Sequence, residues 1–165
     1  MNFKFKASVL AVLMSVTIYG NSDAASIPED ASRHHGHHYK VYNFSLVWNE
    51  AEEFCENMGG HLVTITSDSE QRFVHNLILE RGHKEYYWLG GYRTEYGTWR
   101  WITAEQPVYS NWAEGQPDNY RGIEDVLMMY RSDNYHNRVR SGQWNDTNHN
   151  SIQDFGFVCE WESRY

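Results

Sequence analysis

The sequence predicts an α+β fold in which two helices pack on small antiparallel sheets and a long loop region separates the strands. Two observations predict this class. Apolar residues recur at three- and four-residue spacing between Ser45 and Gly59 and between Ser67 and Gly82, as in amphipathic helices. After Gly82 the chain changes to short aromatic and β-branched runs that are typical of strands. The segments between these runs are long and rich in Gly, Asn, Asp and Ser, which indicates functional loops.

The first predicted helix lies between two predicted strands, over residues 39–44 and 62–65. Ser45 is the expected N-cap because its hydroxyl can accept a hydrogen bond from a free N–H group of the first turn. The expected buried positions are Leu46, Trp48, Ala51, Phe54 and Cys55. Gly59 and Gly60 follow where a left-handed residue is favoured, so we expect the helix to end there.

The second predicted helix begins after Ser67, and Glu70 three residues later completes a capping-box pattern. Its expected buried positions are Phe73, Val74, Leu77 and Ile78. Further strands are predicted over residues 87–91, 98–102, 125–130 and 157–161. The sequence has no internal repeat and predicts one domain over residues 39–165.

Residues 1–25 are predicted to be a secretory signal peptide. Lys4 and Lys6 precede an uncharged apolar run over residues 7–18, and small residues near Ala25 offer a cleavage site. The run is shorter than the roughly 20 residues of a membrane span, although an uncleaved anchor is an alternative. No later segment is apolar enough to span. We therefore expect a secreted or extracellular protein, in the periplasm or at the cell surface if the organism is bacterial.

The charge of the remaining chain narrows the classes of partner. Without residues 1–25 it contains 12 basic and 21 acidic residues, a net charge near −9. Nucleic-acid binding needs clustered Lys and Arg, so we do not expect a nucleic-acid partner. An acidic domain suits cation binding, although a solvated acidic surface would explain most of these charges.

Residues 26–38 are polar and contain four closely spaced histidines, His34, His35, His37 and His38. Such a tract can bind zinc or nickel. However, the local sequence offers no packed scaffold and no supporting groups that would orient the imidazoles. We therefore expect a flexible linker or an unspecific metal-binding tail.

Cys55 and Cys159 are the two cysteines of the chain. An oxidising compartment favours a disulfide bond between them, and two free buried thiols are the alternative. The bond would close a loop of about 100 residues, for which the chain-entropy model gives roughly 4.7 kcal/mol of stabilisation.

The segment from Tyr109 to Asp146 gathers oxygen-bearing side chains among glycines, a proline and aromatic residues. These side chains belong to Gln116, Asp118, Glu124, Asn145 and Asp146. Calcium takes roughly six to eight oxygen ligands in an adaptable geometry. Three carboxylates and two amide carbonyls would neutralise the ion and leave coordination positions open. The sequence therefore predicts a Ca²⁺ site in this segment.

Several motifs, in their order and spacing, resemble the C-type lectin-like domain over residues 39–161. They are Trp48-x-x-Ala51-x-x-x-Cys55, Gly60-His61-Leu62-Val63, Trp88-Leu89-Gly90-Gly91, Trp99-x-Trp101, Asn111-Trp112, Gln116-Pro117-Asp118, Trp144-Asn145-Asp146 and Val158-Cys159-Glu160. The resemblance implies that fold and a bond between Cys55 in the first helix and Cys159 in the last strand. Many members brace the long loop with a second disulfide, for which this chain has no cysteines. Calcium would then supply more of the loop's order.

The resemblance also implies roles for the loop residues. The family's principal calcium ligands match Gln116, Asp118, Glu124, Asn145 and Asp146, with a cis peptide bond before Pro117. Adjacent sugar hydroxyls would coordinate the ion and contact Gln116, Asp118, Glu124 and Asn145. Gln-Pro-Asp resembles the galactose and N-acetylgalactosamine class, and Glu-Pro-Asn the mannose class. Tyr120 lies where galactose binders often carry a Trp that stacks on the sugar, and an exposed loop aromatic is the alternative. Asn119, Glu124 and Asp125 match part of a second calcium site.

These observations favour a secreted, calcium-dependent lectin that binds galactose or N-acetylgalactosamine on glycoproteins, glycolipids or cell surfaces. A homo-oligomer would strengthen weak single sites through avidity, although no interface motif is present. The alternative is a module of the same fold that recognises protein or ice. Catalysis is not expected, because the histidines outside the tract are scattered and no nucleophile-plus-base arrangement is visible. These are His61, His75, His83, His136 and His149.

Overall fold

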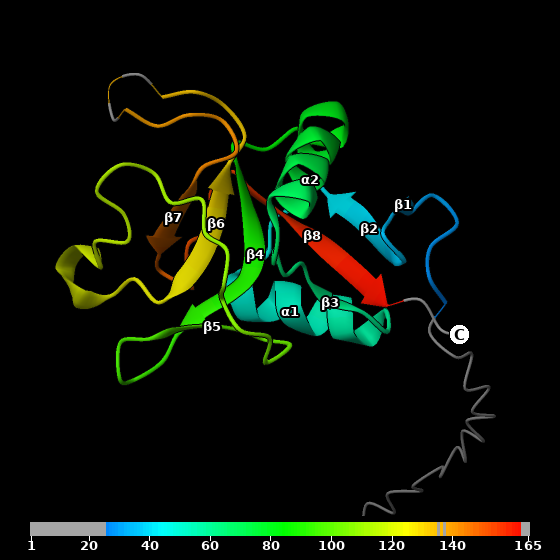
Figure 1. Cartoon of the computed structure of the whole chain (residues 1–165), viewed down its shortest axis with the longest axis horizontal. Coiled ribbons are helices and arrows are strands. Elements are labelled where there is room, and N and C mark those ends of the chain that lie inside the picture. Colours follow the sequence, from blue (N-terminus) through cyan, green and yellow to red (C-terminus); the bar gives the residue numbers. More distant parts are fainter. Residues whose placement is uncertain (1–25, 135, 137, 163–165) are drawn as a thin grey trace, which may run out of the picture.

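The computed structural model describes residues 26–134, 136 and 138–162, so the predicted signal peptide lies outside the described residues. Within this part of the chain, two α-helices and eight β-strands form an α+β domain (Figure 1), which confirms the predicted class. Neither of these helices has the length and apolar character that a membrane crossing requires.

The predicted small antiparallel sheets are joined into one mixed sheet. Its strands follow the order β1-β2-β8-β4-β6-β7, with β3 paired to β8 and β5 paired to β4. The strands β4 and β8 run parallel, and the other described pairs are antiparallel. The bounds are β1 Ser32–His34, β2 His37–Tyr42, β3 His61–Leu62, β4 Tyr86–Arg93, β5 Trp99–Trp101, β6 Val126–Tyr130, β7 Trp144–Thr147 and β8 Phe155–Glu162.

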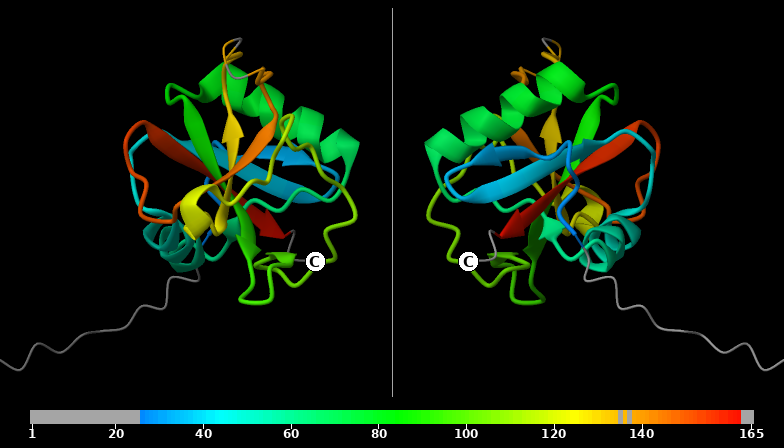
Figure 2. Two further views of the ribbon diagram at one scale, coloured as in Figure 1. Left: turned by 90° about the vertical axis from the view of Figure 1, so that its left-hand side faces the viewer. Right: turned by 90° about the vertical axis from the view of Figure 1, so that its right-hand side faces the viewer.

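The helices α1 (Trp48–Asn57) and α2 (Asp68–Arg81) pack on opposite faces of the sheet (Figures 1 and 2). The strand β8 shows this division, because successive side chains of a strand point to opposite faces. Phe157 and Cys159 pack in the cluster that contains α1, and Val158 packs in the cluster that contains α2. One central strand therefore contributes to two hydrophobic cores.

The start of α1 differs from the prediction. Its N-cap is Val47, whose backbone N–H donates to the Glu50 carboxylate at 3.3 Å. The Ser45 hydroxyl instead donates to the carbonyl oxygen of Phe155 at 3.0 Å, on the distant strand β8. The prediction of Ser45 as the N-cap is wrong. The Ser45 hydroxyl forms a tertiary hydrogen bond to Phe155 and does not cap the helix.

The start of α2 agrees with the prediction. The Ser67 hydroxyl accepts a hydrogen bond from the Glu70 N–H at 3.2 Å. The return bond of the capping box is displaced by one residue, since the Glu70 carboxylate accepts from the Thr66 N–H at 2.8 Å. The same carboxylate accepts from the Tyr39 hydroxyl at 2.7 Å, so the buried Glu70 also joins α2 to β2.

The histidine-rich segment is folded rather than flexible from Ser32 onward. The strands β1 and β2 form a hairpin whose turn residues His35 and Gly36 both have positive φ. The strand β2 then pairs with β8 from His37 opposite Glu162 to Tyr42 opposite Phe157. The expectation of a flexible tail is wrong for this segment. Its strand β2 pairs with β8, which lies more than 100 positions later in the sequence, and this pairing outweighs the polar composition.

The disulfide bond between Cys55 and Cys159 is present, as predicted. It joins α1 to β8 across 104 positions of sequence, with a Cα–Cα distance of 5.5 Å. Both residues are fully buried, and the chain has no free cysteine. The bond therefore fixes the helix to the strand that runs through both cores.

Candidate metal centre

The long loop is anchored in the hydrophobic core through Trp144. The Trp144 N–H donates to the carbonyl of Asn111 at 2.8 Å, and the Ala113 N–H donates to the carbonyl of Trp144 at 2.9 Å. The Trp144 indole N–H donates to the amide oxygen of Gln71 in α2 at 2.8 Å. Asn145 and Asp146 follow Trp144 along β7, so their backbone positions are fixed by the core.

A tight turn brings Gln116 and Asp118 together. The peptide bond between Gln116 and Pro117 is cis, as the resemblance implied. The Gln116 N–H donates to the Ala113 carbonyl at 3.0 Å, and the Gln116 side-chain oxygen accepts from the Asp118 N–H at 3.0 Å. The Gln116 side chain therefore folds back onto the backbone of Asp118.

The chain then reverses at Asn119, so that Glu124 returns toward Asp118. Asn119 has a φ of 47°, in the left-handed region that Asn tolerates better than most residues. Its side-chain oxygen accepts from the Glu124 N–H at 3.1 Å, and the Glu124 carboxylate accepts from the Tyr120 N–H at 2.9 Å. Asn119 is thus a positioning residue of the turn, a role that the sequence did not reveal.

Three carboxylates converge at this point. One oxygen each from Asp118, Glu124 and Asp146 lies within 4.8 Å of the other two. Asp146 is fully buried and accepts hydrogen bonds from the Asp118 N–H at 3.1 Å and the Asn119 N–H at 2.8 Å. Among the described residues, no Lys, Arg or His forms an ion pair with any of the three.

The convergence perturbs the ionisation of the cluster. Burial raises the pKa of the Glu124 carboxyl to about 7, and the neighbouring charges of Asp146 and Asp118 add to the rise. Burial also raises the pKa of Asp146, against hydrogen bonds from Asn119 and Asp118 that favour the ionised form. Like charges in a partly buried site disfavour ionisation unless a cation neutralises them.

Asn145 supplies an unused acceptor next to these carboxylates. Its amide nitrogen donates to the carbonyl of Asp146 at 2.6 Å. Its side-chain oxygen is buried and has no hydrogen-bond partner within the described part of the chain. A buried acceptor without a donor is costly, and a bound cation would satisfy it.

The residues fit a calcium ion by their chemistry. The donor set consists of oxygen atoms, with three carboxylates in mutual proximity and an orphaned amide oxygen on Asn145, the residue next to Asp146 in the sequence. The structure brings Asp118, Glu124 and Asp146 together directly. Gln116 adjoins this group through its bond to Asp118, and Asn145 adjoins it through its bond to Asp146.

Two other predicted residues, Tyr120 and Asp125, make contacts outside the group of three carboxylates. The side chain of Tyr120 is 57% exposed, and the Arg121 guanidinium lies 5.0 Å from the centre of its ring. Asp125, which matched part of a second calcium site, accepts instead from the His149 ring at 2.7 Å. No pattern in the sequence signalled this His149 contact.

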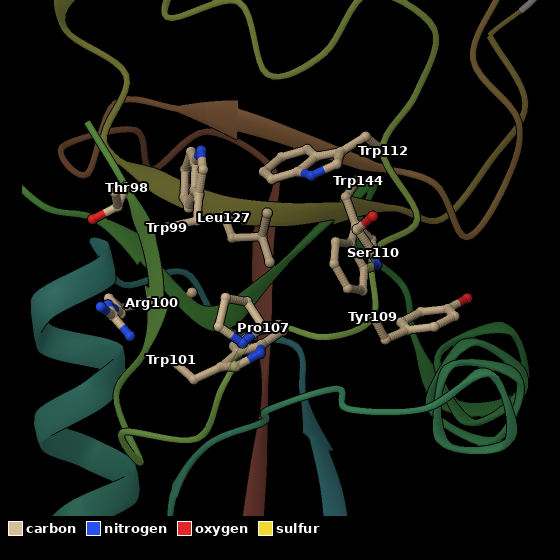
Figure 3. Close-up of a pocket in the computed structure, with 11 residues that line it drawn as sticks. Thr98, Trp99, Arg100, Trp101, Pro107, Tyr109, Ser110, Trp112, Leu127 and Trp144 are labelled. Atoms are coloured by element: carbon tan, nitrogen blue, oxygen red, sulfur yellow. The ribbon is translucent and has the colours of Figure 1, made fainter.

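An aromatic cavity of about 320 Å³ lies at the base of the loop (Figure 3). The rings of Trp99 and Trp112, which line it, meet edge to face with their centres 5.0 Å apart. Pro107, Tyr109 and Trp144 line other parts of it. None of the five predicted ligands lines this cavity, so it is separate from the metal centre.

Known proteins resemble this chain in both sequence and structure. The family model described as the Lectin C-type domain matches residues 45–161. A perlucin-like protein of Mytilus galloprovincialis is 37% identical over 116 residues, which are 68% of each chain. One chain of a snaclec coagulation factor IX/factor X-binding protein of Echis carinatus is 38% identical over 104 residues, which are 56% of this chain and 78% of that one. The cow C-type carbohydrate-recognition domain of CD23, determined with a GlcNAc2Man3 oligosaccharide, matches with a TM-score of 0.70 and 28% identity, covering 85% of this chain and 98% of that one.

Proposed function

The chain belongs to the C-type lectin domain family, and from this premise we propose that it is a secreted, calcium-dependent lectin that prefers galactose or N-acetylgalactosamine. The observation that carries the proposal is the convergence of Asp118, Glu124 and Asp146 without a positive partner among the described residues. Secretion rests on the predicted signal peptide over residues 1–25. The proposed ligands are glycans on glycoproteins, glycolipids or cell surfaces.

The ion would be held by Gln116, Asp118, Glu124, Asn145 and Asp146. When bound, calcium supplies open coordination positions that two adjacent sugar hydroxyls can occupy. The carboxylates of Asp118 and Glu124 would accept hydrogen bonds from those hydroxyls, and the amides of Gln116 and Asn145 would donate to their oxygens. Asp146, which is fully buried, would hold the turn and neutralise charge rather than contact the sugar.

The proposed sugar preference rests on the order of donor and acceptor around Pro117. Gln116 presents an amide donor before the proline, and Asp118 presents an acceptor after it. The reverse arrangement, Glu then Asn, would favour a sugar whose hydroxyls have the opposite orientation. We propose that the exposed ring of Tyr120 stacks on the apolar face of the sugar.

The test is retention on a galactose resin with calcium and after chelation. We expect retention with calcium, release by chelator and recovery when calcium is restored. The double variant Gln116→Glu with Asp118→Asn keeps the oxygen donors but reverses the order, so it should lose galactose and gain mannose binding. Retention that chelator leaves unchanged would overturn the proposal. Unchanged sugar preference in the double variant would overturn the assignment of specificity.

A second candidate is recognition of a protein through the same loop surface. The similarity to a snaclec chain, whose name describes the binding of coagulation factors, favours it. The two candidates differ in their response to free sugar. Free galactose should compete with a glycan ligand and should leave a purely protein–protein contact intact.

A further inference from the structure

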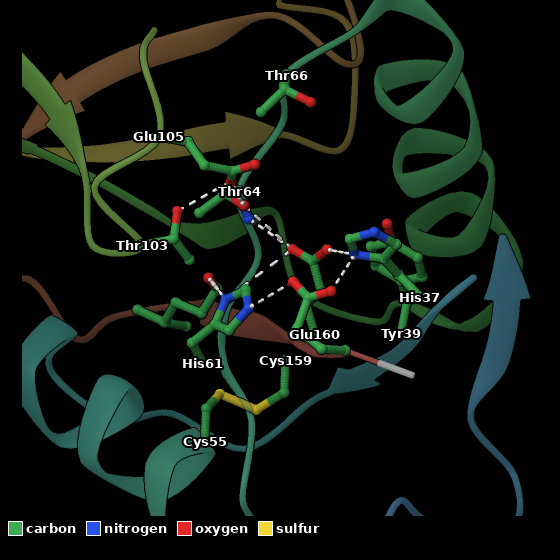
Figure 4. A network of polar contacts seen from close by, with 12 residues as sticks. His37, Tyr39, Cys55, His61, Thr64, Thr66, Thr103, Glu105, Cys159 and Glu160 are labelled. Carbon is green, nitrogen blue, oxygen red and sulfur yellow. Dashed lines mark hydrogen bonds and ion pairs between the residues drawn. A yellow bond between two sulfur atoms is a disulfide. The ribbon is translucent and has the colours of Figure 1, made fainter. Parts of the chain in front are cut away.

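A second group of side chains of the types that bind metals lies on the sheet, outside the loop (Figure 4). Glu160 and Glu162 are two residues apart on β8, so their side chains point to the same face. In the antiparallel register, His37 of β2 lies opposite Glu162, and His61 of β3 lies opposite Glu160. Residues directly opposite each other share a face, so three strands place two imidazoles beside two carboxylates.

Three side chains of this cluster lie close enough together to share one small ion, and His61 lies next to them. The His37 Nδ1 atom lies 2.6 Å from Oε1 of Glu160 and 3.4 Å from Oε2 of Glu162. The His61 Nε2 atom lies 3.8 Å from Oε1 of Glu162. Ligand atoms bound tetrahedrally at about 2.0–2.2 Å from one zinc ion are roughly 3.3–3.6 Å apart. The ligand atoms of His37, Glu160 and Glu162 already lie within 4.8 Å of one another, and a side-chain shift of His61 toward Glu162 would add the fourth ligand.

His61 is oriented as a metal ligand. Its Nδ1 atom lies 2.9 Å from the carbonyl oxygen of Leu62, and a carbonyl only accepts, so Nδ1 carries the proton. The Nε2 atom is buried and has no hydrogen-bond partner among the described residues. An Nδ1–H bond to a backbone carbonyl is the arrangement that commonly fixes metal-binding imidazoles. The unprotonated form of Nε2 and the Glu162 carboxylate are both acceptors, so a cation between them would satisfy both.

Within the cluster, Glu160 is buried and held in place, whereas His37 and Glu162 are accessible to solvent. The side chain of Glu160 is 1% exposed, and its Oε2 accepts from the Thr64 N–H at 3.0 Å. The side chains of His37 and Glu162 are 33% and 65% exposed, so an ion can enter from solvent. A cavity of about 320 Å³, lined in part by His37 and Glu160, leaves room for a water ligand.

The ligand types distinguish this cluster from the loop. Two imidazole nitrogens favour zinc and related transition metals, whereas calcium prefers oxygen ligands alone. We propose that His37, His61, Glu160 and Glu162 form a binding site for a transition-metal dication, zinc in particular, that ties β2 and β3 to β8. The ion would bind only the folded state, in which β2 and β3 pair with β8, and would therefore stabilise that state.

The experiment is calorimetric titration of the whole chain with Zn²⁺ in excess calcium, together with thermal unfolding in the same buffers. We expect one zinc ion per chain and a higher Tm with zinc. His37→Gln and Glu162→Gln, both at solvent-accessible positions, should weaken zinc binding at least about tenfold and remove the rise in Tm. The matched controls His83→Gln and Glu80→Gln change an exposed histidine and an exposed glutamate elsewhere, and should bind zinc as the parent chain does.

Circular dichroism of each variant separates loss of a ligand from loss of the fold. A folded His37→Gln or Glu162→Gln variant that binds zinc as tightly as the parent chain would overturn the site. Zinc affinity that falls in Asp118→Asn but not in Glu162→Gln would assign the ion to the loop and would equally overturn it. Calcium that displaces zinc from the parent chain at comparable concentration would contradict the proposed selectivity.

Discussion

The two carboxylate clusters of this domain hold their charges in different ways. In the loop, Asp146 and Glu124 accept hydrogen bonds from backbone N–H groups and otherwise face carboxylates. On the sheet, Glu160 is contacted by the His37 imidazole and by Thr64. The loop cluster therefore lacks a positive partner within the described residues, whereas the sheet cluster contains a group that can become positive.

The supports of the two clusters differ as well. The positions on β2, β3 and β8 are fixed by the continuous backbone ladder of the sheet. The positions in the loop depend on a few turn hydrogen bonds around Asn119 and on the anchor at Trp144. Bound calcium should thus contribute much of the order of the loop, whereas the backbone ladder orders the sheet without calcium. The following predictions test this contrast, beginning with the largest expected effect.

Calcium should protect the loop from proteolysis far more than the sheet. At a calcium concentration about 100 times the Kd, binding stabilises the bound state by about 2.7 kcal/mol, which corresponds to about a hundredfold fewer open loops. Trypsin cleavage after the exposed Arg121 should therefore accelerate strongly on chelation, as followed by mass spectrometry. Cleavage after the exposed Arg72 of α2 is the internal control and should not change. Equal cleavage after Arg121 in both conditions would contradict the contrast.

Substitutions in the two clusters should differ in their effect on stability without calcium. Glu160→Ala leaves the buried Thr64 N–H without its acceptor, so the free energy of unfolding should fall by about 2 kcal/mol, roughly thirtyfold in the equilibrium constant. Glu124→Ala removes a like-charge contact and, in the opposite direction, the acceptor of the exposed Tyr120 N–H, so the net change in that energy should be less than about 0.5 kcal/mol. Urea unfolding in chelator measures both. Equal losses would show that the loop carboxylates are supported as well as the sheet ones.

Acidification should weaken calcium binding, and this effect should be smaller than the two effects above. Burial and the charges of Asp146 and Asp118 raise the pKa of Glu124 to about 7, so this carboxyl is largely protonated below that pH when calcium is absent. Calcium must displace the proton, and its affinity should fall by up to about tenfold per pH unit below 7. Without calcium the sign is opposite, because a raised folded-state pKa makes stability fall as pH rises from the ordinary Glu value through about 7.

Calcium titrations at pH 6, 7 and 8 measure this effect. Glu124→Gln is the matched control, and its weaker calcium binding should vary less with pH across this range. Flat affinity in the parent chain would show that calcium binding displaces no proton from Glu124.

Local patterns predicted the features that depend on neighbouring residues. The N-cap at Ser67 was predictable because both of its partners lie within one helical turn. A group of oxygen-bearing side chains in the loop was predictable because these residues are concentrated among glycines, a proline and aromatic residues. The cis bond before Pro117 followed from the family resemblance rather than from physical reasoning.

Features that depend on partners distant in the sequence could not be predicted from local patterns. Ser45 bonds to Phe155, so its role was decided by a residue 110 positions away. The hairpin of β1 and β2 is held in place because β2 pairs with β8. The contact between His37 and Glu160 joins residues 123 positions apart. Asn145 and Asp146 were predicted to be ligands, but no strand was predicted here, although Trp144–Thr147 form the strand β7 that places both residues.

The antiparallel pairing of β2 with β8 also determines which way the domain faces when it is attached to something else. His37 at the start of β2 lies opposite Glu162 at the end of β8, and the loop projects from the other side of the sheet (Figure 1). A tag, a spacer or another polypeptide joined after Glu162 would leave the loop pointing away from the attachment. Immobilising the protein through that end should therefore display the loop outward on a sensor surface.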